Sequence, residues 1–234
     1  VGPGVWNGWK AKLISELYYE THALLTGSGA TVNRSERVAA AQSAFSFALP
    51  EDWTRRKLSA YMRLHSDAYW LNFSTDLQVH HATLIERSKT QPLIIDARPD
   101  PERACAEITV ICQDDAGLFA RLSGACASAG MDILDARIST TTNGLAVDVL
   151  HVQEAGLSNA LDATRTQRLC KIMRAALEGS VNLNDPPQAE ISEKTRRTLK
   201  TFDHETQVNF DNQASEHASV LEISTSDRPG LLFD

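Results

Sequence analysis

The spacing of apolar and polar positions divides the chain into a helical first part and a mixed second part. Before residue 90 the apolar residues recur three or four positions apart, as in one face of a helix. This spacing predicts helices within residues 1–27, over 34–47, from an N-cap at Asp52, and over 75–85. The helical spacing ends near Pro92, so the sequence predicts a mostly helical segment over residues 1–92.

After Pro92 the order of elements is strand, helix, strand, strand, helix. Alternating or continuous apolar runs predict strands over 106–112, 131–140 and 145–152. The dipeptide Asn143-Gly144, a strong hairpin signal, joins the last two strands. The two helices are expected from a cap at Asp114 or Asp115 to a stop at Gly130, and from Asn159 or Asp162 to Gly179.

One strand is missing from a ferredoxin-like βαββαβ unit. We expect residues 206–210 to supply it after an inserted linker over about 181–204, whose basic run we interpret as a solvated surface. A short strand is also expected over 93–95, and residues 98–101 indicate a loop at a domain boundary. The fold class is therefore α+β, with a first mixed domain over 103–212.

The end of the chain repeats an earlier segment. Leu221–Phe233 has the layout of 108–119, a strand that leads into an Asp-x-x-Gly-Leu turn, with Asp227 in place of Asp114 and Gly230 in place of Gly117. We expect residues 217–234 to be a truncated second copy and the chain to be a piece of a larger protein.

Composition narrows the classes of function. A net charge of −7 argues against nucleic acid or an anionic membrane as the main partner, and no apolar run approaches the length of a bilayer span. The four cysteines form no CxxC pair, so we interpret them as reduced thiols of a cytoplasmic protein.

The sequence offers no catalytic residue and no metal site. His80 and His81 form the one histidine pair, and adjacent helical positions point about 100° apart, which is poor geometry for one metal ion. No HExxH, GxSxG, Asp-x-Asp or Gly-rich phosphate loop is present. We therefore expect no active site in this chain.

The Asp-x-x-Gly-Leu turn has the chemistry of a binding site for a free amino acid. A glycine followed by a helix N-terminus presents unpaired amides and a positive dipole end to a carboxylate, and the preceding aspartate can hold an ammonium group. The alternative is that the turn is only a good strand-to-helix connection. The candidate ligand-binding residues of the two copies are Asp114, Asp115, Gly117 and Leu118, and Asp227, Gly230 and Leu231.

These two motifs, with the β-α-β-β-α order after the first, resemble tandem ACT domains, small ferredoxin-like regulatory modules. The block Gly2–Lys10, which contains Trp6-Asn7-Gly8-Trp9, and the helix after it resemble the segment behind the HD domain of the bifunctional uridylyltransferase/uridylyl-removing enzymes. The order of helical segment, ACT domain, basic linker and second ACT domain is similar to that family over nearly the whole chain.

The resemblance implies a role that none of the residues above establishes alone. Such an enzyme uses UTP and magnesium to uridylylate the nitrogen-regulatory protein PII when glutamine is scarce, and removes the group when glutamine is plentiful. The resemblance places those catalytic domains before Val1, and leaves the ACT pair here as a glutamine sensor without a cofactor of its own. The first copy departs from the pattern, with Asp115-Ala116 where the second has Arg228-Pro229.

Two alternatives remain. The ACT units could pair with each other as an interaction module that binds no ligand, or the chain could belong to another amino-acid-regulated enzyme.

Overall fold

The computed structural model describes residues 34–101, 103–154, 161–180, 205–213 and 219–226, together with seven residues between 14 and 26. The predicted linker over 181–204 and the second turn after residue 226 lie outside the described residues.

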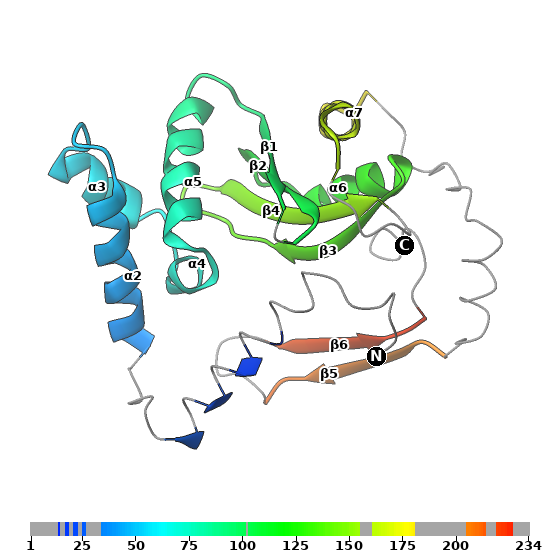
Figure 1. Ribbon diagram of the computed structural model, residues 1–234, viewed down its shortest axis with the longest axis horizontal. Helices are drawn as coiled ribbons and strands as arrows, with labels where there is room; N and C mark the ends of the chain where they lie inside the picture. The colour runs from blue at the N-terminus through cyan, green and yellow to red at the C-terminus, as the bar shows by residue number, and fades with distance from the viewer. Residues whose placement is uncertain are drawn as a thin grey trace.

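Four helices lie within residues 34–88 (Figure 1). They are α2 (Arg34–Ala48), α3 (Arg55–Met62), α4 (Asp67–Asn72) and α5 (Thr75–Ser88). The predicted cap at Asp52 is wrong, because the hydroxyl of Thr54 accepts the Lys57 amide at 3.2 Å and the helix begins two residues later. Helix α4 was not predicted, because six residues are too few to show a helical period.

The second part is a four-stranded antiparallel sheet with two helices. Its strands are β1 (Ile94–Asp100), β2 (Cys105–Gln113), β3 (Met131–Arg137) and β4 (Leu145–Glu154), in the spatial order β1-β2-β4-β3. Helices α6 (Leu118–Ser128) and α7 (Ala163–Leu177) follow β2 and β4 in the chain. This is the α+β fold with a ferredoxin-like sheet that the sequence predicted.

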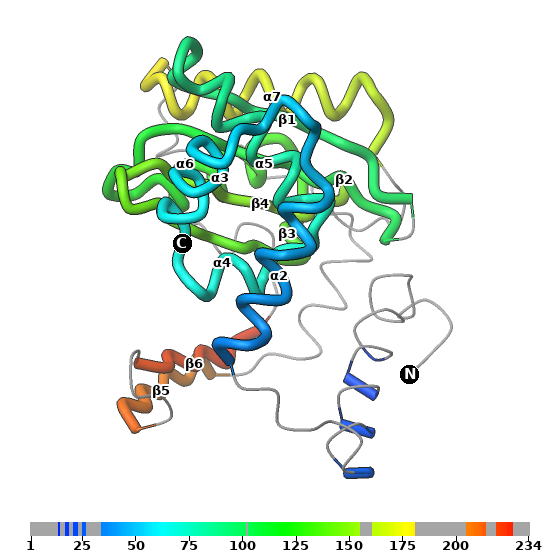
Figure 2. Tube along the Cα trace, turned by 90° about the vertical axis from the view of Figure 1, so that its left-hand side faces the viewer, coloured from blue at the N-terminus to red at the C-terminus, as the bar shows by residue number. Residues whose placement is uncertain are grey.

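The source of the fourth strand differs from the prediction. Strand β1 pairs with β2 along its whole length and so fills the position beside β2 that the last strand of a βαββαβ unit takes. Residues 206–210, predicted for that position, belong largely to β5 (Gln207–Asp211), which pairs with β6 (Val220–Ser224) in a separate two-stranded sheet. In Figures 1 and 2 these two strands stand apart from the four-stranded sheet.

The physical reason lies in the connection lengths. Only residues 101–104 separate β1 from β2, so closing this hairpin costs little chain entropy. The predicted boundary loop at 98–101 is wrong because Arg98, Pro99 and Asp100 are part of β1. Proline is tolerated there because β1 is an edge strand, where one side of the backbone has no partner strand.

Both faces of the sheet are covered. On one face Ile108, Val110 and Leu150 pack with α6 and α7 through Leu122 and Met173. On the other face, Ile94, Ile111, Val147 and Val149 belong to the same buried cluster as the side chains of the helical segment, among them Phe45, Trp70 and Leu84. The helical segment and the sheet therefore share a core, and packing continues across the predicted boundary at residue 92.

Candidate functional site

The turn after β2 is tied to the hairpin between β3 and β4. The Asp114 amide donates to the Gly144 carbonyl oxygen at 2.8 Å, and the Gln113 side-chain amide donates to the same oxygen at 2.8 Å. The Asp114 carboxylate accepts a hydrogen bond from the Thr140 hydroxyl at 2.8 Å. Asp114 thus joins the turn to the chain that leads into β4, and it does not cap the helix.

Gly117 marks the start of helix α6. Its backbone is left-handed, with φ 78° and ψ 11°, and no side chain caps the helix there. The predicted cap at Asp114 or Asp115 is therefore wrong. The helix begins only after Gly117, because Ala116 and Gly117 are needed to turn the chain from β2 into α6. The Leu118 side chain is only 5% exposed and belongs to the core beneath α6, so only its backbone faces the turn.

Arg121 lies over the turn and was not expected from the sequence. One of its terminal nitrogens is 3.0 Å from the Asp115 carboxylate, and the other donates to the Ala116 carbonyl at 3.2 Å. A Cβ atom on Gly117 would lie 3.8 Å from the guanidinium. The charge that Asp115 adds to the turn is therefore balanced by a cation from the first turn of α6, a pairing that a spacing of six residues did not suggest.

Asp148 is a second residue that sequence analysis missed. It lies on β4 between Ala146 and Leu150, on the face that α6 and α7 cover, and it is only 1% exposed. Burial raises its pKa to about 6, against a hydrogen bond from the Ser139 backbone, and the charge of Asp114 raises it further. One of its oxygens has no hydrogen-bond partner among the described residues. The available signal in the sequence was a carboxylate within the apolar run Leu145–Leu150.

The histidine pair diverges as predicted. His80 bonds Asp96 of β1 at 2.9 Å, whereas His81 is fully buried and lies 3.1 Å from the Tyr69 hydroxyl. Burial, with the nearby His80, lowers the pKa of His81 to about 3, so this ring stays neutral. Within the described ranges no three His, Cys, Asp or Glu side chains gather as metal ligands would.

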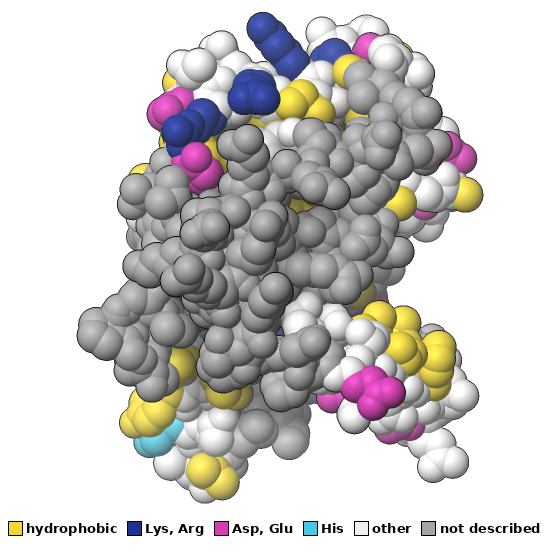
Figure 3. Space-filling model, turned by 90° about the vertical axis from the view of Figure 1, so that its right-hand side faces the viewer, with side chains coloured by type: hydrophobic (Ala, Val, Ile, Leu, Met, Phe, Trp, Pro, Cys, Tyr) yellow, Lys and Arg dark blue, Asp and Glu magenta, His cyan; other side chains and the backbone are white. Residues whose placement is uncertain are grey.

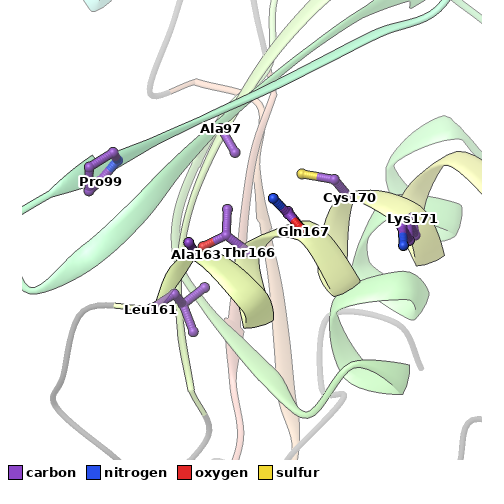
Figure 4. Close-up of a pocket in the computed structure, with 8 residues that line it drawn as sticks. All are labelled: Ala97, Pro99, Leu161, Ala163, Thr166, Gln167, Cys170 and Lys171. Atoms are coloured by element: carbon purple, nitrogen blue, oxygen red, sulfur yellow. The ribbon is translucent and has the colours of Figure 1, made fainter.

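An apolar hollow lies elsewhere, between β1 and α7 (Figure 4). It measures about 540 Å³, and none of the predicted ligand-binding residues lines it. Its walls come from Ala97, Pro99, Leu161, Ala163, Thr166, Gln167, Cys170 and Lys171. A second, polar hollow of about 600 Å³ separates the end of α4 from β3. The structure thus brings Asp114, Asp115 and Gly117 together with Arg121, and neither of these two hollows includes the turn.

The second set of predicted site residues is not described. Asp227, Gly230 and Leu231 lie beyond residue 226, where the described part of the chain ends. The prediction for this copy therefore stays a prediction.

Comparison with known proteins defines the class first. Residues 106–168 match the ACT domain family, and these residues run from β2 into α7. The four-stranded sheet with α6 and α7 is thus an ACT domain, a β-α-β-β-α unit whose remaining strand position is filled by β1.

The whole chain is similar to one kind of enzyme. It is 39% identical over its full length to the bifunctional uridylyltransferase/uridylyl-removing enzyme of Rhodopseudomonas palustris, and 39% identical to that of Nitrobacter winogradskyi. The same enzyme from a Bradyrhizobium strain is 40% identical. The chain matches one section of each of these enzymes, which confirms the resemblance seen in the sequence.

The match covers only part of the relatives. The chain spans 25% of the length of each of these enzymes. Among the described helices none has the length and apolar character to span a bilayer.

Proposed function

We propose that this chain is a regulatory region of a bifunctional uridylyltransferase/uridylyl-removing enzyme, and that its ACT domains sense glutamine. The observation that carries the proposal is similarity along the entire chain, helical segment included, to enzymes of that name. An ACT domain alone would leave the parent enzyme open. The parent acts in the cytoplasm on PII, with UTP and magnesium for the transfer, and its reacting groups lie outside this chain.

The turn supplies the chemistry for an amino-acid effector. The N-terminus of α6 offers amides of its first turn to a carboxylate, and the Arg121 guanidinium adds a positive charge beside it. Asp114 and Asp115 supply negative charge for the ammonium group, and binding exchanges the ion pair between Asp115 and Arg121 for contacts with the ligand. We propose that glutamine binds one arrangement of the ACT pair better than the other and so shifts the balance between the two activities.

The core shared by the sheet and the helical segment can transmit this conformational shift to the rest of the enzyme. Ile111 and Val149 of the sheet pack against the helical segment, and His80 of α5 bonds Asp96 of β1. A change in the sheet therefore moves the helices that precede it in the chain.

A second candidate is an interaction module that binds no ligand. The ion pair between Asp115 and Arg121, which already balances both charges, favours it for the first copy. In that case only the second copy, or neither, would bind glutamine.

The test measures both activities of the full-length protein against glutamine concentration. We expect glutamine to suppress transfer to PII and to stimulate removal. Arg121→Gln should shift the half-maximal glutamine concentration by about tenfold, equivalent to ~1.4 kcal/mol of binding. Arg174→Gln, at an exposed position of α7, should leave it unchanged. Activities that ignore glutamine would refute sensing. An intact response in Arg121→Gln would refute only the first-copy site.

A further inference from the structure

The loop between β3 and β4 contacts the turn after β2 on one side and the helical segment on the other (Figure 1). On the side of the turn, the Thr140 hydroxyl donates to the Asp114 carboxylate and the Asp114 amide donates to the Gly144 carbonyl, each at 2.8 Å. On the other side, the Thr142 amide donates to the Leu64 carbonyl at 2.8 Å. Residues 140–144 thus form a hairpin bridge between the proposed site and the chain that follows α3.

Hydrogen bonds within the hairpin bridge make it rigid. Thr141 is only 4% exposed, and its hydroxyl accepts the Leu145 amide at 2.9 Å. The Gly144 amide donates to the Thr141 carbonyl at 2.9 Å, which closes a β-turn over 141–144. Both central residues of this turn have negative φ, so the turn is of type I. A movement at Thr140 is therefore carried to the central residues of the turn.

Both acidic groups of the site already have partners within the protein. Thr140 holds the Asp114 carboxylate, and Arg121 holds that of Asp115 at 3.0 Å. An ammonium group that approaches Asp114 competes with Thr140 for the same carboxylate. The arrangement with an intact hairpin bridge is therefore the one that binds such a ligand less well.

The helical end of the hairpin bridge borders a polar group that burial leaves uncompensated. His65, next to Leu64, is 8% exposed, and neither of its ring nitrogens has a hydrogen-bond partner among the described residues. Burial of an unpaired polar group costs free energy. A movement of residues 63–65 that exposes the imidazole to water offsets this cost, so the chain after α3 has a second arrangement within reach.

We propose that the hairpin bridge couples the turn to the helical segment: a ligand that takes the Asp114 carboxylate releases Thr140 and thereby weakens the bond between Thr142 and Leu64. This inference rests on the proposed function, because it assigns the route by which glutamine at the first copy acts on the helices. Coupling is reciprocal. Loss of the bond between Thr142 and Leu64 therefore strengthens glutamine binding and favours the arrangement that glutamine favours.

The test breaks the hairpin bridge in the full-length enzyme. Proline suits the second position of a type I turn, so Thr142→Pro removes the amide donor and keeps the turn. Without glutamine, this variant should show the low transfer to PII and high removal that the unmodified enzyme shows at saturating glutamine. Its Kd for glutamine, measured by calorimetry, should fall about fivefold, as expected for the loss of one hydrogen bond. Thr140→Val, which frees Asp114, should act in the same direction.

Three variants serve as controls, and each should respond to glutamine as the unmodified enzyme does. Thr142→Ser keeps both the amide and the hydroxyl, which donates to the Arg63 carbonyl at 3.2 Å. Arg137→Met removes a 2.6 Å bond from β3 to the Asn72 carbonyl, a link to the helical segment outside the hairpin bridge. Arg168→Gln is a surface control on α7, over which Lys and Arg side chains gather at the top of Figure 3.

Urea denaturation checks that each variant is folded, and Thr140→Val decides if Thr142→Pro is not. A normal glutamine response and an unchanged Kd in the bridge variants would refute the hairpin bridge and leave glutamine sensing intact. An effect of Arg137→Met equal to that of Thr142→Pro would show that any loosening of the sheet from the helices is sufficient. Activities of the unmodified enzyme that ignore glutamine would refute the proposed function, and the coupling with it.

Discussion

At the scale of single residues, the turn between β2 and α6 depends on one backbone conformation. Gly117 has φ 78°, in the left-handed region that residues with a Cβ atom rarely adopt. The nearest atom to an added Cβ would be 3.8 Å away, so the space itself is open. Any cost of substitution at Gly117 therefore comes from the backbone and not from packing.

Gly117→Ala should lower the free energy of unfolding by about 1 kcal/mol, measured by urea denaturation. Gly117→Asn should recover part of this loss, because asparagine tolerates the left-handed region. A loss in the asparagine variant equal to that in the alanine variant would show that a contact, and not φ, limits this position.

Asp148 makes stability depend on pH in an unusual direction. Its folded pKa, about 6, lies above the ordinary 3.8, so between these values the folded state binds a proton that the unfolded state does not. This contribution to stability therefore grows as pH falls from about 6 to about 4, and is lost as pH rises through the folded pKa. His65 and His81 act in the opposite direction, since burial lowers the pKa of each.

Asp148→Asn isolates this contribution from the histidines. The variant should be more stable than the parent at pH 7 by about 2 kcal/mol, and the difference should vanish near pH 4. Urea denaturation across this range measures it. A difference that stays constant with pH would mean that Asp148 is not the titrating group.

At the scale of elements, sequence patterns located most helices and strands but not the pairing of β1. Strands β2 and β4 and helices α6 and α7 were predicted because each has a clear apolar period and a recognisable stop, such as Gly130. Pairing across the sheet was not visible, since Ile94–Asp100 carries charges and a proline that look like a loop. The roles of Arg121 and Asp148 could not be predicted either, because they depend on tertiary contacts. The turn over Asp114–Gly117 could be predicted, because its signal is local in the sequence.

A pair of equivalent substitutions tests the strand assignment. Ile94→Asp should destabilise the ACT domain by more than about 3 kcal/mol, because Ile94 is 3% exposed between the sheet and the helices. Gln207→Asp, at the equivalent place in β5, should stay within about 0.5 kcal/mol. Both losses are measured by denaturation. A larger loss in Gln207→Asp than in Ile94→Asp would indicate that β5, and not β1, pairs with β2.

At the scale of the whole molecule, the helical segment and the ACT domain are one packed body. The buried cluster that contains Phe45 and Trp70 also contains Val147 and Val149 of the sheet. The regulation proposed above requires such a connection between the sheet and the helices that precede it in the chain.

This shared core predicts cooperative unfolding. Leu169→Ala, in the fully buried layer under α7, should lower the free energy of unfolding by about 2–4 kcal/mol. Hydrogen exchange should show the same loss at residues 77–85 of α5 and at 147–152 of β4. Lys171→Ala, exposed on the same helix, is the matched control. A loss confined to the sheet would show that the two parts unfold separately.

The most direct test of glutamine sensing is hydrogen exchange of the full-length enzyme with and without glutamine. We predict slower exchange at residues 118–121, at 230–234, or at both, and no change with an equal concentration of leucine. Protection in one copy alone would identify the binding copy. Unchanged exchange at both turns, at a glutamine concentration that alters transfer to PII, would contradict the account.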